Sequence, residues 1–63
     1  MLSQRELEVL IVLATGATNK ESGKKLFISI STVKTHIINI YTKLQVSNRV
    51  EAIKKALEHG LIT

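Results

Sequence analysis

The sequence contains no cysteine, no proline, only three glycines and only two aromatic side chains, Phe27 and Tyr41. Without cysteine, neither a disulfide nor a thiolate metal site can supplement the core, which fits a reducing compartment. The longest apolar run, residues 9–14, is much too short to cross a bilayer. The acidic Glu6 near the N-terminus is unlike the start of a signal peptide. We therefore expect a cytoplasmic protein without membrane segments, stabilised by packed apolar side chains.

Acidic residues are also few. Nine Lys and Arg against five acids give a net charge of +4 over 63 residues, so residues 1–63 are expected to form one small basic domain. Such a charge favours polyanionic partners, either nucleic acid or anionic lipid, although a basic surface without a partner is equally compatible with it. The chain offers no nucleophile with a base beside it, and its two histidines are far apart. We expect no enzyme activity, no cofactor, no metal and no small-molecule ligand.

Helix start signals occur four times, and no segment has the strict alternation of a half-buried strand. The signals are three capping boxes and one single capping residue, namely Ser3 with Glu6, Thr18 with Glu21, Asn48 with Glu51, and Ser29. Glycine follows the first and the last of these segments. The sequence therefore predicts an all-α fold of four helices, at about residues 4–15, 19–26, 30–44 and 49–59.

Spacings of three and four residues predict which side of each helix is buried. The expected buried stripes are Leu7, Leu10, Ile11 and Ala14 in the first helix, Ile30, Val33, Ile37, Ile40 and Leu44 in the third, and Ile53, Ala56 and Leu57 in the fourth. Residues 61–62 are expected to fold back onto the fourth helix. In the second helix, Gly23 is expected to let the third helix approach closely.

The outer side of the third helix has an unusual composition. It is predicted to carry Ser31, Lys34, Thr35, Ile38 and Thr42, flanked by Thr32, His36, Asn39 and Lys43, and residues 29–44 contain no acid. A solvated helix face usually mixes acids with lysines, whereas a face of Lys, Thr, Ser, Asn and His suits phosphates and base edges. A short helix, a turn and a longer helix form a helix-turn-helix, whose second helix enters the DNA major groove.

The segments LSQRELEVL, TNKES, KLFISISTVKTHIINIYTKLQV and NRVEAIKKALEHGLI resemble, in order and spacing, the LuxR/GerE-type helix-turn-helix domain of bacterial transcription regulators. The resemblance covers nearly the whole chain and is most specific at residues 32–36. It implies a four-helix domain that binds double-stranded DNA, serves as the output domain of a longer regulator such as the response regulator of a two-component system, and dimerises on inverted half-sites through the fourth helix. RNA polymerase is a further partner that it allows.

The resemblance also implies roles for individual residues. Base contacts fall on Lys34, Thr35 and Ile38. Contacts with the DNA backbone fall on Thr18, Asn19, Lys20, Ser31, Thr32, His36, Lys43 and Arg49. Dimer contacts are expected on the outward side of the fourth helix, at Glu51, Lys54, Lys55 and Glu58.

The sequence departs from the family pattern in two places. Ser22 and Gly23 stand where the family has an aliphatic residue followed by alanine, so we expect a weak second helix that Ser22→Ile combined with Gly23→Ala would stabilise. Ile38 stands at an often polar position, where it either contacts thymine methyl groups or packs partly on Tyr41 or Thr42. Two other functions remain open: a basic module that binds an acidic protein, and region 4 of a sigma factor.

Overall fold

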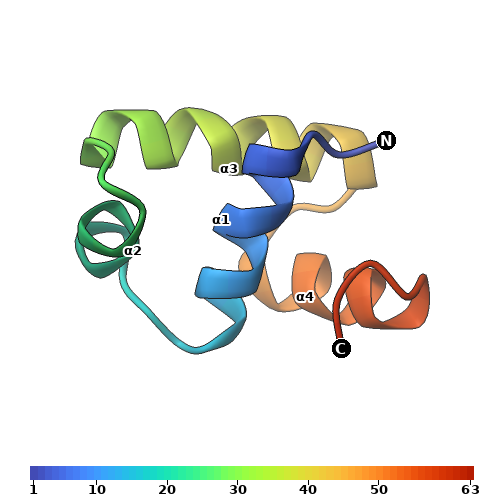
Figure 1. Cartoon of the computed structure of the whole chain (residues 1–63). Coiled ribbons are helices and arrows are strands. Elements are labelled where there is room, and N and C mark those ends of the chain that lie inside the picture. Colours follow the sequence, from blue (N-terminus) through green and yellow to red (C-terminus); the bar gives the residue numbers. More distant parts are fainter.

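The computed structural model describes all 63 residues and contains four α-helices and no strand: α1 (Gln4–Ala14), α2 (Asn19–Leu26), α3 (Ile30–Leu44) and α4 (Arg49–Glu58). The predicted all-α fold is confirmed, although α1 and α4 each end one residue earlier than expected. The central helix, α1, packs against the other three. Helix α3 lies across α1, α2 lies beside the start of α3, and α4 lies near the end of α3 (Figure 1). None of these helices combines the length and the apolar character that a membrane crossing requires.

Each helix begins at a residue whose side chain accepts a hydrogen bond from the backbone of the third helical residue; these residues are Ser3, Thr18, Ser29 and Asn48. Two capping boxes are complete, because the carboxylates of Glu6 and Glu21 accept from the backbone N–H of the capping residue. The third predicted capping box, Asn48 with Glu51, is wrong in one of its two hydrogen bonds, the one from the backbone N–H of Asn48 to the Glu51 carboxylate. Glu51 Oε1 accepts the N–H of Ser47 at 2.9 Å, one residue before the helix cap.

The core consists of eight buried apolar residues from α1, α3, α4 and the C-terminal segment: Val9, Leu10, Leu13, Val33, Ile40, Ala52, Ala56 and Ile62. The predicted return of residues 61–62 is confirmed, since Ile62 is buried and Leu61 packs against the core. The short side chains of Ala52 and Ala56 form the completely buried side of α4.

Several predicted core positions are wrong. In α1, Ile11 and Ala14 are exposed, while Val9 and Leu13 are completely buried beside Leu10. The reason is that α1 contacts three helices, so its buried side is set by neighbours that the local spacing does not reveal. The same correction applies to Ile30 in α3 and Leu57 in α4, which were expected in buried stripes and are exposed.

Helix α2 contains no completely buried apolar side chain; its buried residues are Ser22 and Gly23. Ser22 lies on the core side, and its Oγ donates to the carbonyl oxygen of Thr18 at 2.8 Å. The buried hydroxyl is therefore satisfied inside the helix. Partly buried Leu26 joins α2 to the core, so α2 depends on little apolar burial of its own.

The turn after α2 uses an unusual backbone conformation. Phe27 has a φ of 59°, in the left-handed region, and its side chain is 94% exposed. This conformation costs a non-glycine residue about 1–2 kcal/mol.

Gly23, inside α2, lies close to the backbone of the following turn. A Cβ placed on Gly23 would lie 2.7 Å from the carbonyl oxygen of Ile28. Gly23 is thus required by the backbone of the turn rather than by α3, and this contact predicts a cost for Gly23→Ala where the sequence predicted a benefit.

Candidate nucleic-acid interface

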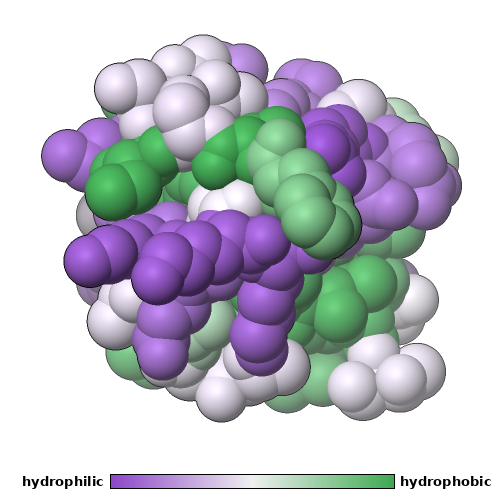
Figure 2. Space-filling view, turned by 60° about the vertical axis from the view of Figure 1, so that its left-hand side comes forward, coloured by the Kyte–Doolittle hydropathy of each residue, from purple (hydrophilic) through white to green (hydrophobic).

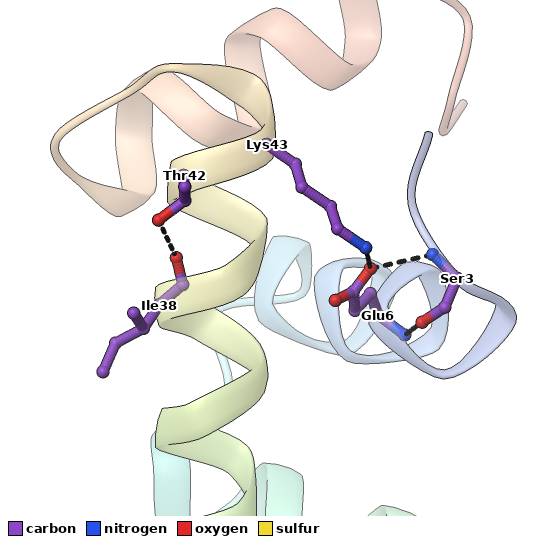
Figure 3. Close-up of polar contacts among 5 residues, drawn as sticks. All are labelled: Ser3, Glu6, Ile38, Thr42 and Lys43. Carbon is purple, nitrogen blue, oxygen red and sulfur yellow. Dashed lines mark hydrogen bonds and ion pairs between the residues drawn. The ribbon is translucent and has the colours of Figure 1, made fainter.

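The outward side of α3 is composed as the sequence predicts. All five predicted outer residues are exposed, namely Ser31, Lys34, Thr35, Ile38 and Thr42. Ile38 and Thr42 project away from α1, on the side of α3 opposite to the one that Lys43 uses (Figure 3). The side chain of Ile38 is 65% exposed, which decides against its packing on a neighbour and leaves it available to a ligand.

The polar groups on this side differ in how free they are. Lys34 makes no ion pair or hydrogen bond within the protein, so its ammonium group can donate all three protons to a ligand. Thr35 Oγ1 donates to the carbonyl oxygen of Ser31 at 3.1 Å, and Thr42 Oγ1 donates to that of Ile38 at 2.9 Å. The hydroxyl of Thr32 pairs with that of Ser29 in the cap of α3, at 2.9 Å.

The second half of α3 is fixed to α1 by an ion pair. Lys43 Nζ lies 2.8 Å from Glu6 Oε1, which also accepts the backbone N–H of Ser3 at 2.8 Å (Figure 3). Glu6 is only 4% exposed. The hydrogen bond from Lys43, followed by that from Ser3, holds the pKa of the Glu6 carboxyl below its ordinary value. Lys43, expected on the DNA backbone, is therefore engaged inside the protein.

Two arginines act in the same way at other helix junctions. Arg49, also expected on the DNA backbone, donates from Nη2 to the carbonyl oxygen of Leu13 at the end of α1. Arg5 donates to the carbonyl oxygen of Leu26 at 2.9 Å and pairs with Glu8 at 3.2 Å. Arg5 was not among the residues predicted from the sequence. Both arginines bind the C-terminal carbonyl end of a helix, where a positive charge is favoured.

The remaining residues expected on the DNA backbone lie near the start of α2 and on the flank of α3. Lys20 is exposed and has no partner in the protein, whereas Asn19 is partly buried. Thr18 accepts the N–H of Glu21 at 3.1 Å as the cap of α2, and the hydrogen bonds from Thr18 lower the pKa of the Glu21 carboxyl. His36 is partly buried and makes no side-chain hydrogen bond.

The face over the turn between α2 and α3 is shown in Figure 2, where apolar side chains border a row of hydrophilic ones. A shallow groove there is lined by Lys20, Gly23, Lys24, Phe27, Ile28, Ser29 and Ile30. The exposure of Phe27 and Ile30 was not predicted. Only the positions of the neighbouring helices decide it, so no local signal in the sequence identifies this groove.

On α4, the four residues expected to make dimer contacts line a shallow groove together with Gln45 and Val46. Glu51 is engaged by the backbone of Ser47, and Lys55 is partly buried. Two apolar residues of α4 are exposed although this was not predicted, Val50 at 77% and Leu57 at 50%. Positions 50, 54 and 57 share one side of the helix, because they are four and three residues apart. Apolar residues at positions 50 and 57 of this spacing are the signal in the sequence that indicates an apolar side of α4.

Comparison with known proteins agrees with this arrangement. The family described as "Bacterial regulatory proteins, luxR family" matches residues 1–56. The chain is 54% identical to the transcriptional regulatory protein LiaR of Bacillus subtilis over 61 residues, which are 97% of this chain and 29% of LiaR. It is 45% identical to the response regulator VraR of Staphylococcus aureus over 62 residues, 98% of this chain and 30% of VraR.

Two solved structures are also similar. The response regulator ChrA of a heme-sensing two-component system superimposes with a TM-score of 0.95 and 50% identity, over 98% of this chain and 31% of ChrA. The transcription factor GerE superimposes with a TM-score of 0.93 and 37% identity, over 98% of this chain and 92% of GerE. The chain thus spans less than a third of LiaR, VraR and ChrA, and nearly all of GerE. With its four helices, its helix-turn-helix and a match over most of its length, the chain belongs to the luxR family of bacterial regulatory proteins.

Proposed function

We propose that this chain is the DNA-binding output domain of a bacterial transcription regulator and that it recognises a specific double-stranded sequence with α3 in the major groove. The observation that carries the proposal is the exposed, acid-free side of α3, on which Lys34 has no partner within the protein. A free ammonium group beside hydroxyl and apolar side chains fits the acceptors and methyl groups that the major groove presents. Membership of the luxR family supports the same function.

In this proposal, the bases are contacted by Lys34, Thr35 and Ile38. Lys34 is placed to donate to guanine O6 and N7, the most frequent specific contact of a basic side chain. The phosphates are contacted by Lys20, by Thr18 and Asn19 at the start of α2, and by Ser31, Thr32 and His36. Lys43 and Arg49 have their charges engaged between helices, so their part in DNA binding is mainly to position α3 and α4.

We also propose that the domain binds two inverted half-sites as a homodimer through α4. Val50 and Leu57 supply exposed apolar area on either side of Lys54, and Lys54 and Glu58 can form pairs across a two-fold axis. One helix gives a small interface, so the dimer is expected on DNA and not in free solution.

The relatives suggest a wider setting. VraR and ChrA are response regulators, and the chain covers less than a third of either. We place this domain in a longer cytoplasmic response regulator of a two-component system, with RNA polymerase as a further partner. Its family is one of DNA-binding regulators and not a class of enzymes.

The proposal is tested by measuring the affinity of the chain for a duplex enriched from a random pool and for a random duplex, across a range of salt concentrations. Lys34→Ala should weaken binding to the enriched duplex more than to the random one. Loss of one good base contact corresponds to about 1–3 kcal/mol. Lys25→Ala, which removes an equal charge from the exposed side of α2, is the matched control and should leave the ratio of the two affinities unchanged.

If the pool yields no preferred duplex and Lys34→Ala changes nothing, the basic side of α3 serves only general electrostatic attraction. The remaining function would then be binding of an acidic protein. In that case the double substitution of Lys34 and Thr35 by alanine should also leave DNA affinity unaffected.

A further inference from the structure

Two threonines on the outer side of α3 have already used their only hydroxyl proton. Thr35 Oγ1 donates to the carbonyl oxygen of Ser31 at 3.1 Å. Thr42 Oγ1 donates to that of Ile38 at 2.9 Å, as Figure 3 shows. A hydroxyl group carries one proton and two acceptor lone pairs. While these bonds persist, each threonine offers a ligand a methyl group and lone pairs, but no donor.

Ile38 lies between the two threonines on the same side of the helix, because residues three and four positions apart are neighbours there. Its side chain is 65% exposed and contains no polar atom. We name the methyl groups of Thr35 and Thr42 together with the side chain of Ile38 the methyl stripe. From Thr35 to Thr42 the stripe covers seven residue steps, or about 10 Å along the helix. This length corresponds to about three base pairs at 3.4 Å each.

The major groove presents one apolar group, the C5 methyl of thymine; its other groups are hydrogen-bond donors and acceptors. A guanine opposite the methyl stripe would present two acceptors to side chains that have no free donor, so guanine would lose its hydrogen bonds to water without replacement. Thymine presents one acceptor there, O4, in place of two, and its C5 methyl gains apolar contact. Lys34, at the edge of the stripe, is the one outer side chain with free protons and a positive charge.

We infer that the methyl stripe recognises thymine C5 methyl groups, so that each half-site carries thymines opposite Ile38 and its threonine neighbours and a guanine opposite Lys34. This inference rests on the proposed DNA-binding function and specifies its substrate. It assigns Thr35 a role through its methyl group and not through hydrogen-bond donation. Ile38 is the principal specificity residue of the stripe, because it exposes the most apolar surface.

The inference is tested by removing single methyl groups from the DNA. In a duplex enriched from a random pool, each thymine is replaced in turn by uracil, which lacks only the C5 methyl and pairs in the same way. Affinities are measured by fluorescence anisotropy. Uracil at one to three adjacent positions of each half-site should weaken binding about fourfold per methyl group lost from contact. Uracil at the other positions should have no effect.

Matched variants locate the contact on the protein. Ile38→Ala should bind the thymine and uracil duplexes equally at the sensitive position, and Thr42→Ser, which keeps the hydroxyl and loses the methyl, should do so at a neighbouring one. Lys34→Ala should keep the sensitivity to uracil while losing discrimination at the guanine. Thr15→Ser is the control, since Thr15 is an exposed threonine at the C-cap of α1 whose hydroxyl also donates to a carbonyl oxygen, that of Val12 at 2.6 Å.

The outcomes separate this inference from the function on which it rests. If a preferred duplex is enriched and its complete replacement of thymine by uracil leaves affinity unchanged, the methyl stripe is refuted while sequence-specific binding stands. The stripe is likewise refuted if Ile38→Ala remains as sensitive to uracil as the wild type. Failure to enrich any duplex overturns both.

Discussion

Replacing Lys43 by methionine separates two roles that the sequence and the structure assign to this residue. The substitution keeps the aliphatic part of the side chain and removes the ammonium group that lies 2.8 Å from Glu6 Oε1. The family resemblance implies that the charge contacts a DNA phosphate. The structure instead uses the charge to join α3 to a carboxylate on α1 that is almost completely buried.

The expected loss of stability follows from the geometry. A hydrogen bond to a charged group contributes about 1.5–3 kcal/mol net. Because the Lys43 side chain is 42% exposed, solvent screens the pair and the lower end, about 1.5 kcal/mol, applies. Domains have total stabilities of about 0.05–0.15 kcal/mol per residue, or about 3–9 kcal/mol for 63 residues. The melting temperature should therefore fall by about 6–12 °C.

The assay is thermal unfolding of Lys43→Met followed by far-UV circular dichroism, with Lys20→Met as the control. Lys20 is an exposed lysine without a partner, so its replacement should leave the midpoint nearly unchanged. Equal midpoints for the two variants would refute the stabilising role of the Lys43–Glu6 pair. If Lys43→Met also retained full stability while lowering the slope of log affinity against log salt by about 0.9, the phosphate contact would be its role instead.

The same pair predicts how stability depends on pH. The pKa of Glu6 in the folded protein is below its ordinary value of 4.5, first because of the hydrogen bond from Lys43. The ionised carboxylate therefore contributes its stabilisation fully above about pH 4.5, and this contribution is lost as the pH falls toward the lower folded pKa. Lys43→Met should lose part of this pH dependence, seen as wild-type and variant midpoints that converge as the pH is lowered.

Three further substitutions test the fold. Gly23→Ala should lower the urea midpoint, because overpacking against the Ile28 carbonyl oxygen at 2.7 Å costs about 1–3 kcal/mol and the gain in helix propensity is about 1 kcal/mol; a higher midpoint would contradict the close contact. Phe27→Asn should raise the melting temperature by a few degrees, since asparagine tolerates the left-handed conformation better and the exposed ring has little packing to lose. Arg49→Met should lower the melting temperature more than Lys54→Met does, because only Arg49 donates to the carbonyl end of α1.

The parts of the fold that could be predicted are those that depend on neighbours in the sequence. Helix starts at Ser3, Thr18 and Ser29 were predicted because a capping side chain acts on residues three positions away. The outer side of α3 was predicted for the same reason, since helical spacing alone places Lys34 and Ile38 together. The family resemblance assigned roles to these residues, and the structure places them on the exposed surface.

The parts that could not be predicted depend on contacts between distant segments. The partner of Lys43 is 37 residues away, and that of Arg49 is 36 residues away. No spacing rule in the sequence connects such residues. The clash at Gly23 likewise depends on where the backbone of the following turn returns, so helix propensity alone gave the wrong sign for its replacement by alanine.

These distant contacts change how the positive charge of the domain should be understood. Of the nine Lys and Arg residues, Arg5, Lys43 and Arg49 are bound to carboxylate or carbonyl oxygens where helices meet, and the other six, which include Lys20 and Lys34, have no partner in the protein. The first group fixes the position of α3 and α4 relative to α1. The second group leaves its charges free, and Lys20 and Lys34 are the members that we propose to contact DNA. The net charge of +4 therefore attracts a polyanion in general, whereas the specific interaction depends on a few free groups that the other cations hold in position.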